Sequence, residues 1–227
     1  MKINIKEQVL ETVGFFAVFA LALFLPAGTL AWSAGWIFLL LFFGFYLTVT
    51  LWLYRHNPGW MQERMHLSAS NQQGWDKILF PIMEIFFIVW LIFISLDAVR
   101  FHWSFVPLWL QLIGALILLC SFYFLFLTFS ENSYLSPVVR VQEERGHTVV
   151  STGLYHHVRH PMYMAILILI VGTSLLLGSW YGLIFVIICR AILARRAVLE
   201  EQMLLKELSG YADYMAQVKY RLIPYIW

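Results

Sequence analysis

The residues best suited to chemistry lie in one polar segment, 146–163, which reads GHTVVSTGLYHHVRHPMY. Its glycines permit tight turns, and Pro161 suits the first turn of a helix, where its missing N–H would have no partner anyway. His160 and Tyr163 would then lie at the N-terminal end of that helix. Free backbone N–H groups and the helix dipole favour an anion there. We therefore predict a ligand-binding mouth at this helix start.

Other interpretations of these residue types stay open. Aromatic, arginine and histidine side chains commonly mark the headgroup level of a membrane, so the segment could be purely interfacial. His156, His157 and His160 could bind a metal, although no thiol or acidic partner has a matching spacing. The two cysteines, Cys120 and Cys189, lie in apolar runs. We expect them to pack there rather than to form a disulfide or a metal pair.

The elements that position this segment must be largely covered by lipid. The chain has 227 residues, of which 61% are hydrophobic and only 12% are charged, whereas a soluble domain has roughly a quarter charged residues. The mean hydropathy is +0.76. A net charge of +2 without a basic cluster argues against a nucleic-acid partner.

Apolar stretches predict an all-α fold, a polytopic transmembrane bundle of five to six spans. A helix needs about 20 apolar residues to cross a bilayer. The sixth stretch is short and contains Arg190, whose head group would have to reach the interface. We favour six spans, because short turns rich in glycine separate the first pair and the last pair. The stretches are 12–32, 36–54, 78–96, 106–129, 162–177 and 181–194.

The basic residues predict the orientation. With six crossings, all of the 15 lysines and arginines except Arg100 fall on the side of both termini. Basic residues near membrane ends concentrate on the cytoplasmic side. We therefore expect an integral, multi-pass membrane protein whose N- and C-termini and long polar segments, 55–77 and 130–160, are cytoplasmic. The tail from residue 200 is predicted to begin as an amphipathic helix capped by Gly210, with a second short helix over 211–218.

The C-terminal part of the chain resembles a known family. The run from His147 to Tyr163, followed by Glu-Glu at 200–201, Gly-Tyr at 210–211 and Arg-Leu-Ile-Pro at 221–224, resembles the isoprenylcysteine carboxyl methyltransferases. These are integral membrane enzymes that use S-adenosylmethionine. The resemblance covers about 132–227. It implies N-terminal transmembrane helices over 1–130 and a cytosolic methyltransferase core over 131–227, within one structural domain.

The resemblance also implies the residues of a cofactor site. Tyrosine rings would pack on the adenine or the sulfonium, the helix start would take the carboxylate, and Glu201 would hold the amine. The cofactor-binding set is Gln142, His147, Thr148, Val149, Val150, Tyr155, His160, Pro161, Met162, Tyr163 and Glu201.

One position departs from the family pattern. The resemblance matches the family's glutamate to Glu201, and the family's arginine for the substrate carboxylate lies four residues before it, at the position that is Ala197 here. Arg196 lies one residue away and Arg195 two. We therefore expect Arg196 and Glu201 to be the catalytic pair, with Arg195 as an alternative to Arg196.

The predicted function is methyl transfer from S-adenosylmethionine to a lipophilic acceptor at the membrane, leaving S-adenosylhomocysteine. The acceptor could be a prenylated cysteine, a lipid or a small thiol, and neither a metal nor a nucleic acid is expected. A phospholipid or small-thiol methyltransferase is the main alternative. A sterol-reductase-like enzyme would need a nicotinamide cofactor, for which no Gly-rich loop is present. A transporter or scaffold is a further alternative, and its intramembrane charge would be Glu84.

Overall fold

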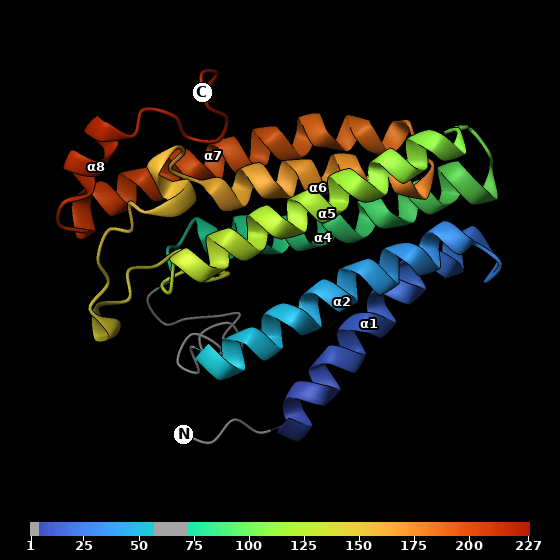
Figure 1. Ribbon diagram of the computed structural model, residues 1–227, viewed down its shortest axis with the longest axis horizontal. Helices are drawn as coiled ribbons and strands as arrows, with labels where there is room; N and C mark the ends of the chain where they lie inside the picture. Colours follow the sequence, from blue (N-terminus) through green and yellow to red (C-terminus); the bar gives the residue numbers. More distant parts are fainter. Residues whose placement is uncertain (1–4, 57–71) are drawn as a thin grey trace.

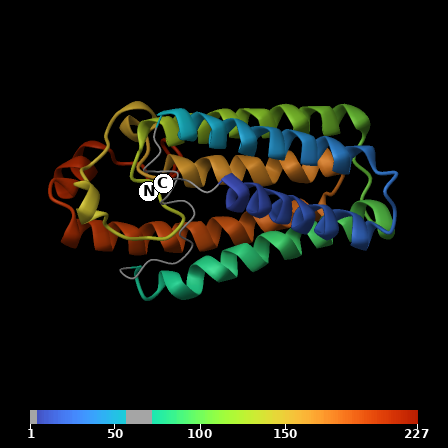
Figure 2. The same ribbon diagram turned by 90° about the horizontal axis from the view of Figure 1, so that it is seen from below.

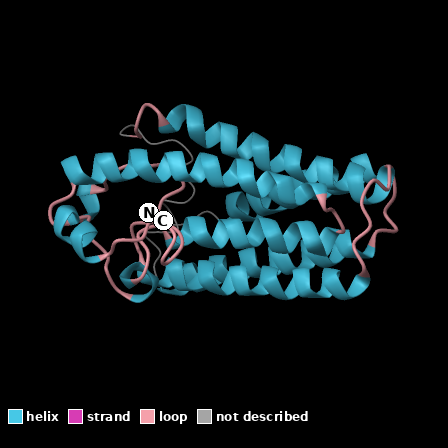
Figure 3. Cartoon of the chain, turned by 90° about the horizontal axis from the view of Figure 1, so that it is seen from above, coloured by secondary structure: helices cyan, strands magenta, loops and turns pink. Residues whose placement is uncertain are grey.

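The computed structural model describes residues 5–56 and 72–227, and every regular element in these ranges is helical (Figure 3). The predicted all-α fold is confirmed. The long helices are α1 (Ile5–Ala27), α2 (Ser33–His56), α4 (Asp76–Ser95), α5 (Leu108–Glu131), α6 (Pro161–Leu177) and α7 (Ile184–Glu207). The short ones are η1 (Leu96–Arg100), η2 (Glu143–Arg145), η3 (Gly153–His156), η4 (Tyr181–Leu183) and α8 (Tyr211–Gln217).

The composition and length of these helices are those of a membrane bundle. In the described ranges, four stretches are long and apolar enough to cross a bilayer, namely Val9–Ala27, Ser33–His56, Asp76–Arg100 and Leu108–Glu131. α6 is apolar but shorter, with 17 residues. Large apolar side chains such as Leu25 and Leu40 are about three-quarters exposed. These exposed faces form the surface that lipid would cover.

The six long helices run in alternating directions along the bundle (Figure 1). The short connections after α1, η1 and α6 lie at one end. The start of α6, the second half of α7, the long 132–160 connection and α8 lie at the other end (Figure 1). Residues 57–71, most of the first predicted polar segment, fall outside the described ranges.

α6 is the central helix. It lies between α5 and α2 on one side and α7 and α4 on the other (Figure 2), and most of its residues are buried. Two glycines let α5 and α6 approach closely: a Cβ at Gly172 would lie 2.6 Å from the backbone N of Leu118, and one at Gly114 would lie 2.5 Å from that of Leu176. Small residues at such a crossing are typical of helix packing in membranes.

Three predicted boundaries were wrong. The first helix ends at Ala27 rather than at residue 32, because Gly28 has φ +71° and turns the chain. The amphipathic tail is not a separate helix, because α7 continues without interruption through Glu207. Gly210 does have a positive φ of +82°, but it precedes α8 rather than capping α7.

Candidate active site

A cavity opens at the end of the bundle where α6 begins. It contains about 830 Å³ of atom-free space, including its open mouth. Its walls come from the 132–150 connection, η3, the start of α6, the second half of α7 and α8. Residues far apart in the sequence therefore share one hollow.

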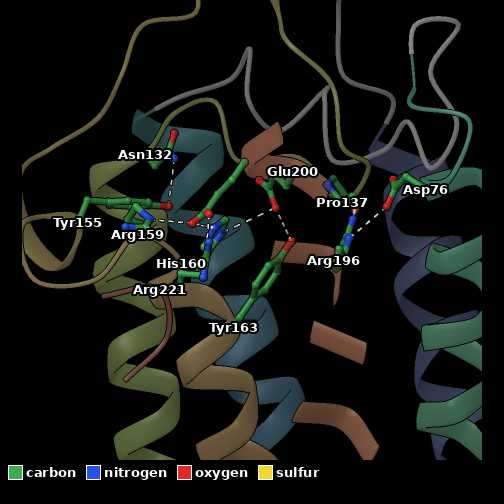
Figure 4. Close-up of polar contacts among 11 residues, drawn as sticks. Asp76, Asn132, Pro137, Tyr155, Arg159, His160, Tyr163, Arg196, Glu200 and Arg221 are labelled. Atoms are coloured by element: carbon green, nitrogen blue, oxygen red, sulfur yellow. Dashed lines mark hydrogen bonds and ion pairs between the residues drawn. The ribbon is translucent and has the colours of Figure 1, made fainter. Parts of the chain in front are cut away.

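The start of α6 places His160 and Tyr163 on this cavity. Pro161 is the first residue of α6, as predicted, and His160 is its N-cap. The two rings are parallel, with centroids 5.2 Å apart. The Tyr163 hydroxyl donates a 2.6 Å hydrogen bond to Oε2 of Glu200, and Nδ1 of His160 lies 3.8 Å from the same oxygen (Figure 4). Tyr163 therefore orients a carboxylate of α7, and the His160 ring lies beside it.

Arg196 lies one helical turn before Glu200 and also lines the cavity. Its Nε donates to Oδ1 of Asp76 at 3.0 Å and its Nη2 donates to the carbonyl oxygen of Pro137 at 2.7 Å (Figure 4). The residue is only 4% exposed. Burial lowers the pKa of this guanidinium, but its interactions with Tyr163, Asp76 and Glu200 raise the pKa by more than burial lowers it. The net shift is upward, so Arg196 keeps its charge.

Glu201 has a different environment from its neighbour. It is 2% exposed and accepts hydrogen bonds from Nε of Arg159 at 2.7 Å, Nε of Arg221 at 2.8 Å and Nε2 of His160 at 3.2 Å. Burial raises the pKa of this carboxyl, but the hydrogen bonds from His160, Arg159 and Arg221 outweigh it and lower the pKa to about 2. Glu201 is not among the residues that line the cavity.

The residues after α8 complete this polar cluster. The backbone N–H groups of Arg159 and His160 donate to the carbonyl oxygens of Tyr220 and Arg221, at 2.9 and 2.8 Å. Nη1 of Arg159 donates to the carbonyl of Val218 at 2.7 Å. Together with Glu201, these bonds fix the backbone immediately before α6 and hence the direction of the His160 ring.

Another part of the cavity wall is aromatic. The rings of Tyr134 and His147 stack with centroids 4.4 Å apart, and both residues line the cavity. Burial, together with the charges of Arg145 and Arg140, lowers the pKa of His147 to about 4, so its ring is neutral at physiological pH. A neutral imidazole stacked on a phenol offers a flat surface to an aromatic ligand.

Gln142 supports this wall from behind. It is fully buried and does not line the cavity. Its Nε2 donates to the carbonyl of Tyr134 at 2.6 Å, its Oε1 accepts from Nη1 of Arg145 at 2.6 Å, and its backbone N–H points at Nδ1 of His147 at 3.4 Å. It therefore holds the stacked pair in place.

Tyr155 is held by hydrogen bonds to its side-chain hydroxyl and to its backbone carbonyl. Its hydroxyl accepts from Nδ2 of Asn132 at 3.0 Å (Figure 4), and its carbonyl accepts from the hydroxyl of Tyr214 at 2.7 Å. Burial raises the pKa of Tyr155 far above its ordinary value, so the phenol stays protonated. Tyr155, Tyr211 and Tyr214 all line the cavity.

The structure brings together nearly all the residues predicted for the site. The predicted residues that line the cavity are His147, Thr148, Val149, Val150, Tyr155, His160, Pro161, Met162, Tyr163 and Arg196. Gln142 and Glu201 lie behind its walls. The two exposed histidines, His156 and His157, do not line it, and no cluster of metal-binding side chains occurs in residues 5–56 and 72–227.

Sequence reasoning missed Glu200 and Asp76. The spacing of Arg196 and Glu200 could have revealed the first, because residues four apart lie on one face of a helix. If Glu200 is the family's glutamate, the arginine four residues before it is present as Arg196, and the apparent departure at Ala197 disappears. No local signal pointed to Asp76, because it lies 120 residues from its partner.

Comparison with known proteins supports the resemblance seen in the sequence. Residues 135–206 match the sequence model of the isoprenylcysteine carboxyl methyltransferase (ICMT) family. Over 85 residues, the chain is 31% identical to the protein-S-isoprenylcysteine O-methyltransferase of Schizosaccharomyces pombe. These 85 residues make up 37% of this chain and 36% of that protein, so the similarity spans little more than a third of either. The segment that forms most of the cavity thus matches the isoprenylcysteine carboxyl methyltransferase family.

Proposed function

We propose that this protein transfers a methyl group from S-adenosylmethionine to the carboxylate of a lipophilic acceptor of the prenylated-cysteine class. One observation carries the proposal: a carboxylate, Glu200, and a guanidinium, Arg196, line the same cavity from one face of α7, within the segment that matches the family. The name of the yeast relative supports the choice of acceptor.

The donor set of the cavity fits the cofactor's chemistry. The stacked Tyr134 and His147 offer a flat surface for an adenine. Glu200, whose side chain is 25% exposed, offers a carboxylate to an ammonium group. When bound, S-adenosylmethionine supplies a methyl group on a positively charged sulfur, which an ionised carboxylate can accept without a base.

Arg196 is the group that would bind the acceptor. Two of its nitrogens are engaged by Asp76 and Pro137, and no residue in the described ranges takes the third, Nη1. An arginine recognises a carboxylate through such N–H groups. The Tyr163 hydroxyl donates a hydrogen bond to Glu200 and so holds this carboxylate away from Arg196. Arg196 and Glu200 can therefore each bind a different ligand group.

The remaining walls position the reactants and exclude water. Val149, Val150, Met203 and Leu204 are apolar and line the cavity beside the charged pair. Exclusion of water strengthens the interactions of Arg196 and Glu200 with bound charges. Positioning of this kind supplies several kcal/mol toward a two-reactant transfer. In the proposed orientation the cofactor enters from the cytosol and the acceptor enters sideways from the lipid.

The test uses the full chain purified into nanodiscs. We expect S-adenosylhomocysteine to bind in calorimetry with a micromolar-range dissociation constant. We expect labelled methyl from S-adenosylmethionine to appear on N-acetyl-S-farnesylcysteine as a base-labile ester. Label on phospholipid or on a small thiol instead would change the acceptor but keep the cofactor. Absence of S-adenosylhomocysteine binding by folded protein would overturn the proposed function.

A further inference from the structure

Asp76 belongs to the candidate site although it lies outside the matched segment. It is the first residue of α4, and its side chain is fully buried. Its Oδ1 accepts the 3.0 Å hydrogen bond from Nε of Arg196 (Figure 4). The N-terminal half of the chain therefore reaches the cavity-lining arginine through one carboxylate.

The second oxygen of Asp76 holds the loop wall of the cavity. Oδ2 accepts from the backbone N–H of Val139 at 2.8 Å and from Nε2 of Gln72 at 3.0 Å. Val139 lines the cavity, and its carbonyl accepts from the backbone N–H of Gln73 at 3.1 Å. With both oxygens engaged, Asp76 ties the loop to α7 and has little freedom to move.

This arrangement determines where Arg196 can point. The guanidinium is planar, so fixing its Nε on Asp76 and its Nη2 on Pro137 also fixes the direction of Nη1. Without Asp76, Arg196 would be free to pair with Glu200, because opposite charges four residues apart on a helix attract each other. An ion pair between Arg196 and Glu200 would leave neither side chain available to bind its proposed ligand group.

We propose that Asp76 is a positioning residue that holds Arg196 away from Glu200 and directs it at the carboxylate of the acceptor. This inference rests on the proposed function and extends it: acceptor recognition depends on a residue of the N-terminal half. Asp76 itself does not line the cavity. Its effect must therefore appear in the preference for an acidic acceptor rather than in the binding of apolar groups.

The experiment compares two ligands in the full-length protein. N-acetyl-S-farnesylcysteine is the acid, and its carboxamide has the same apolar chain without the charge. The KM of the acid and the inhibition constant of the amide are measured for the wild type and for Asp76→Asn. We expect Asp76→Asn to reduce the preference for the acid by about tenfold, the scale of one hydrogen bond to a charged group, and to leave amide binding within about twofold.

The matched control is Asp97→Asn. Asp97 is also fully buried and accepts a hydrogen bond from the Ser179 hydroxyl, but it lies in η1 at the opposite end of the bundle (Figure 1). We expect this variant to keep the wild-type preference. If Asp76→Asn does not fold, Asp76→Glu, which keeps the charge one methylene farther out, carries the same measurement and should also lose preference.

The outcomes separate the two proposals. An unchanged or increased preference in the folded Asp76 variant would overturn the positioning role, as would an equal loss of acid and amide binding, which is the mark of general loosening. A wild type that transfers no methyl to the acid, or that prefers the amide, would instead overturn the proposed function before any variant is considered.

Discussion

Glu200 and Glu201 are chemically identical neighbours with different surroundings. Adjacent residues on a helix point about 100° apart, and of these two only Glu200 lines the cavity. Glu200 lines it with a single hydrogen bond from Tyr163. Glu201 turns toward Arg159, Arg221 and His160. We infer that the first binds a ligand and that the second supports the structure.

Substitution by glutamine should separate these roles. Glu200→Gln should weaken S-adenosylhomocysteine binding by about tenfold, because a hydrogen bond to a charged ligand group is lost, with little change in melting temperature. Glu201→Gln leaves buried cations without their partner and should cost about 3 kcal/mol of stability. Calorimetry and thermal melts of both variants provide the check, with the exposed Glu143→Gln as control. Equal behaviour of the two would contradict the assignment.

The charge of Glu201 also predicts how stability depends on pH. Its pKa falls from 4.5 to about 2 on folding. The folded state thus favours the ionised carboxylate, and the resulting stabilisation is complete above pH 4.5 and is lost as pH falls from 4.5 toward 2. Melting temperature should decline over this interval in the wild type. The decline should be shallower in Glu201→Gln, and parallel curves would show that other groups dominate.

At this scale the sequence predicted most of the cavity wall but not every role. The His147–Val150 run and the His160–Tyr163 element were identifiable from their motifs, and all of them line the cavity. The choice between Glu200 and Glu201 depends on the rotation of α7 by one residue. That rotation is set by packing against α6 and the residues after α8, and the only local hint of it was the four-residue spacing of Arg196 and Glu200.

The positions of the helices were predictable where apolar composition determines them, but not where tertiary packing determines where a helix ends. Runs of apolar residues located the helices α1, α2 and α4 to α7. The helical spacing of apolar residues from residue 199 onward predicted that the tail begins with an amphipathic helix of its own. α7 nevertheless continues through Glu207, since its later half packs Met203 into a small cluster with Tyr211 and Val139. A change of environment along a helix was mistaken for its end.

The α5–α6 crossing gives a prediction about packing. A Cβ at Gly172 would lie 2.6 Å from the backbone N of Leu118. Because the clash is with a backbone atom, only a shift of the two helices can relieve it. Gly172→Ala should therefore cost about 1–3 kcal/mol and lower the melting temperature. Gly44→Ala in α2 meets nothing within 4 Å and should be neutral. A stable Gly172→Ala protein would show that the crossing can widen freely.

The whole molecule places its chemistry at one end. Figure 1 shows that the start of α1, the end of α7 and α8 lie at the same end as the start of α6. All lysines and arginines except Arg100 were predicted for this side. The excess of positive charge there favours the cytoplasmic face.

Reporter fusions test this orientation. We expect a fluorescent protein at either terminus to be bright and a periplasmic-type phosphatase at either terminus to be inactive. A phosphatase inserted between α1 and α2, near Thr29, should be active. The opposite pattern would place the cavity away from the cytosolic supply of S-adenosylmethionine and would exclude the proposed cofactor route.

The pairing of residues 159–160 with 220–221 has a consequence for biosynthesis. All six long helices precede residue 220 in the sequence, so every one of them is synthesised before the backbone in front of α6 can find its partners. The nascent protein would be inactive until then, and the pocket would take shape only once residues 220 and 221 are available to pair. A chain stopped after Gln217 should insert normally and bind no S-adenosylhomocysteine.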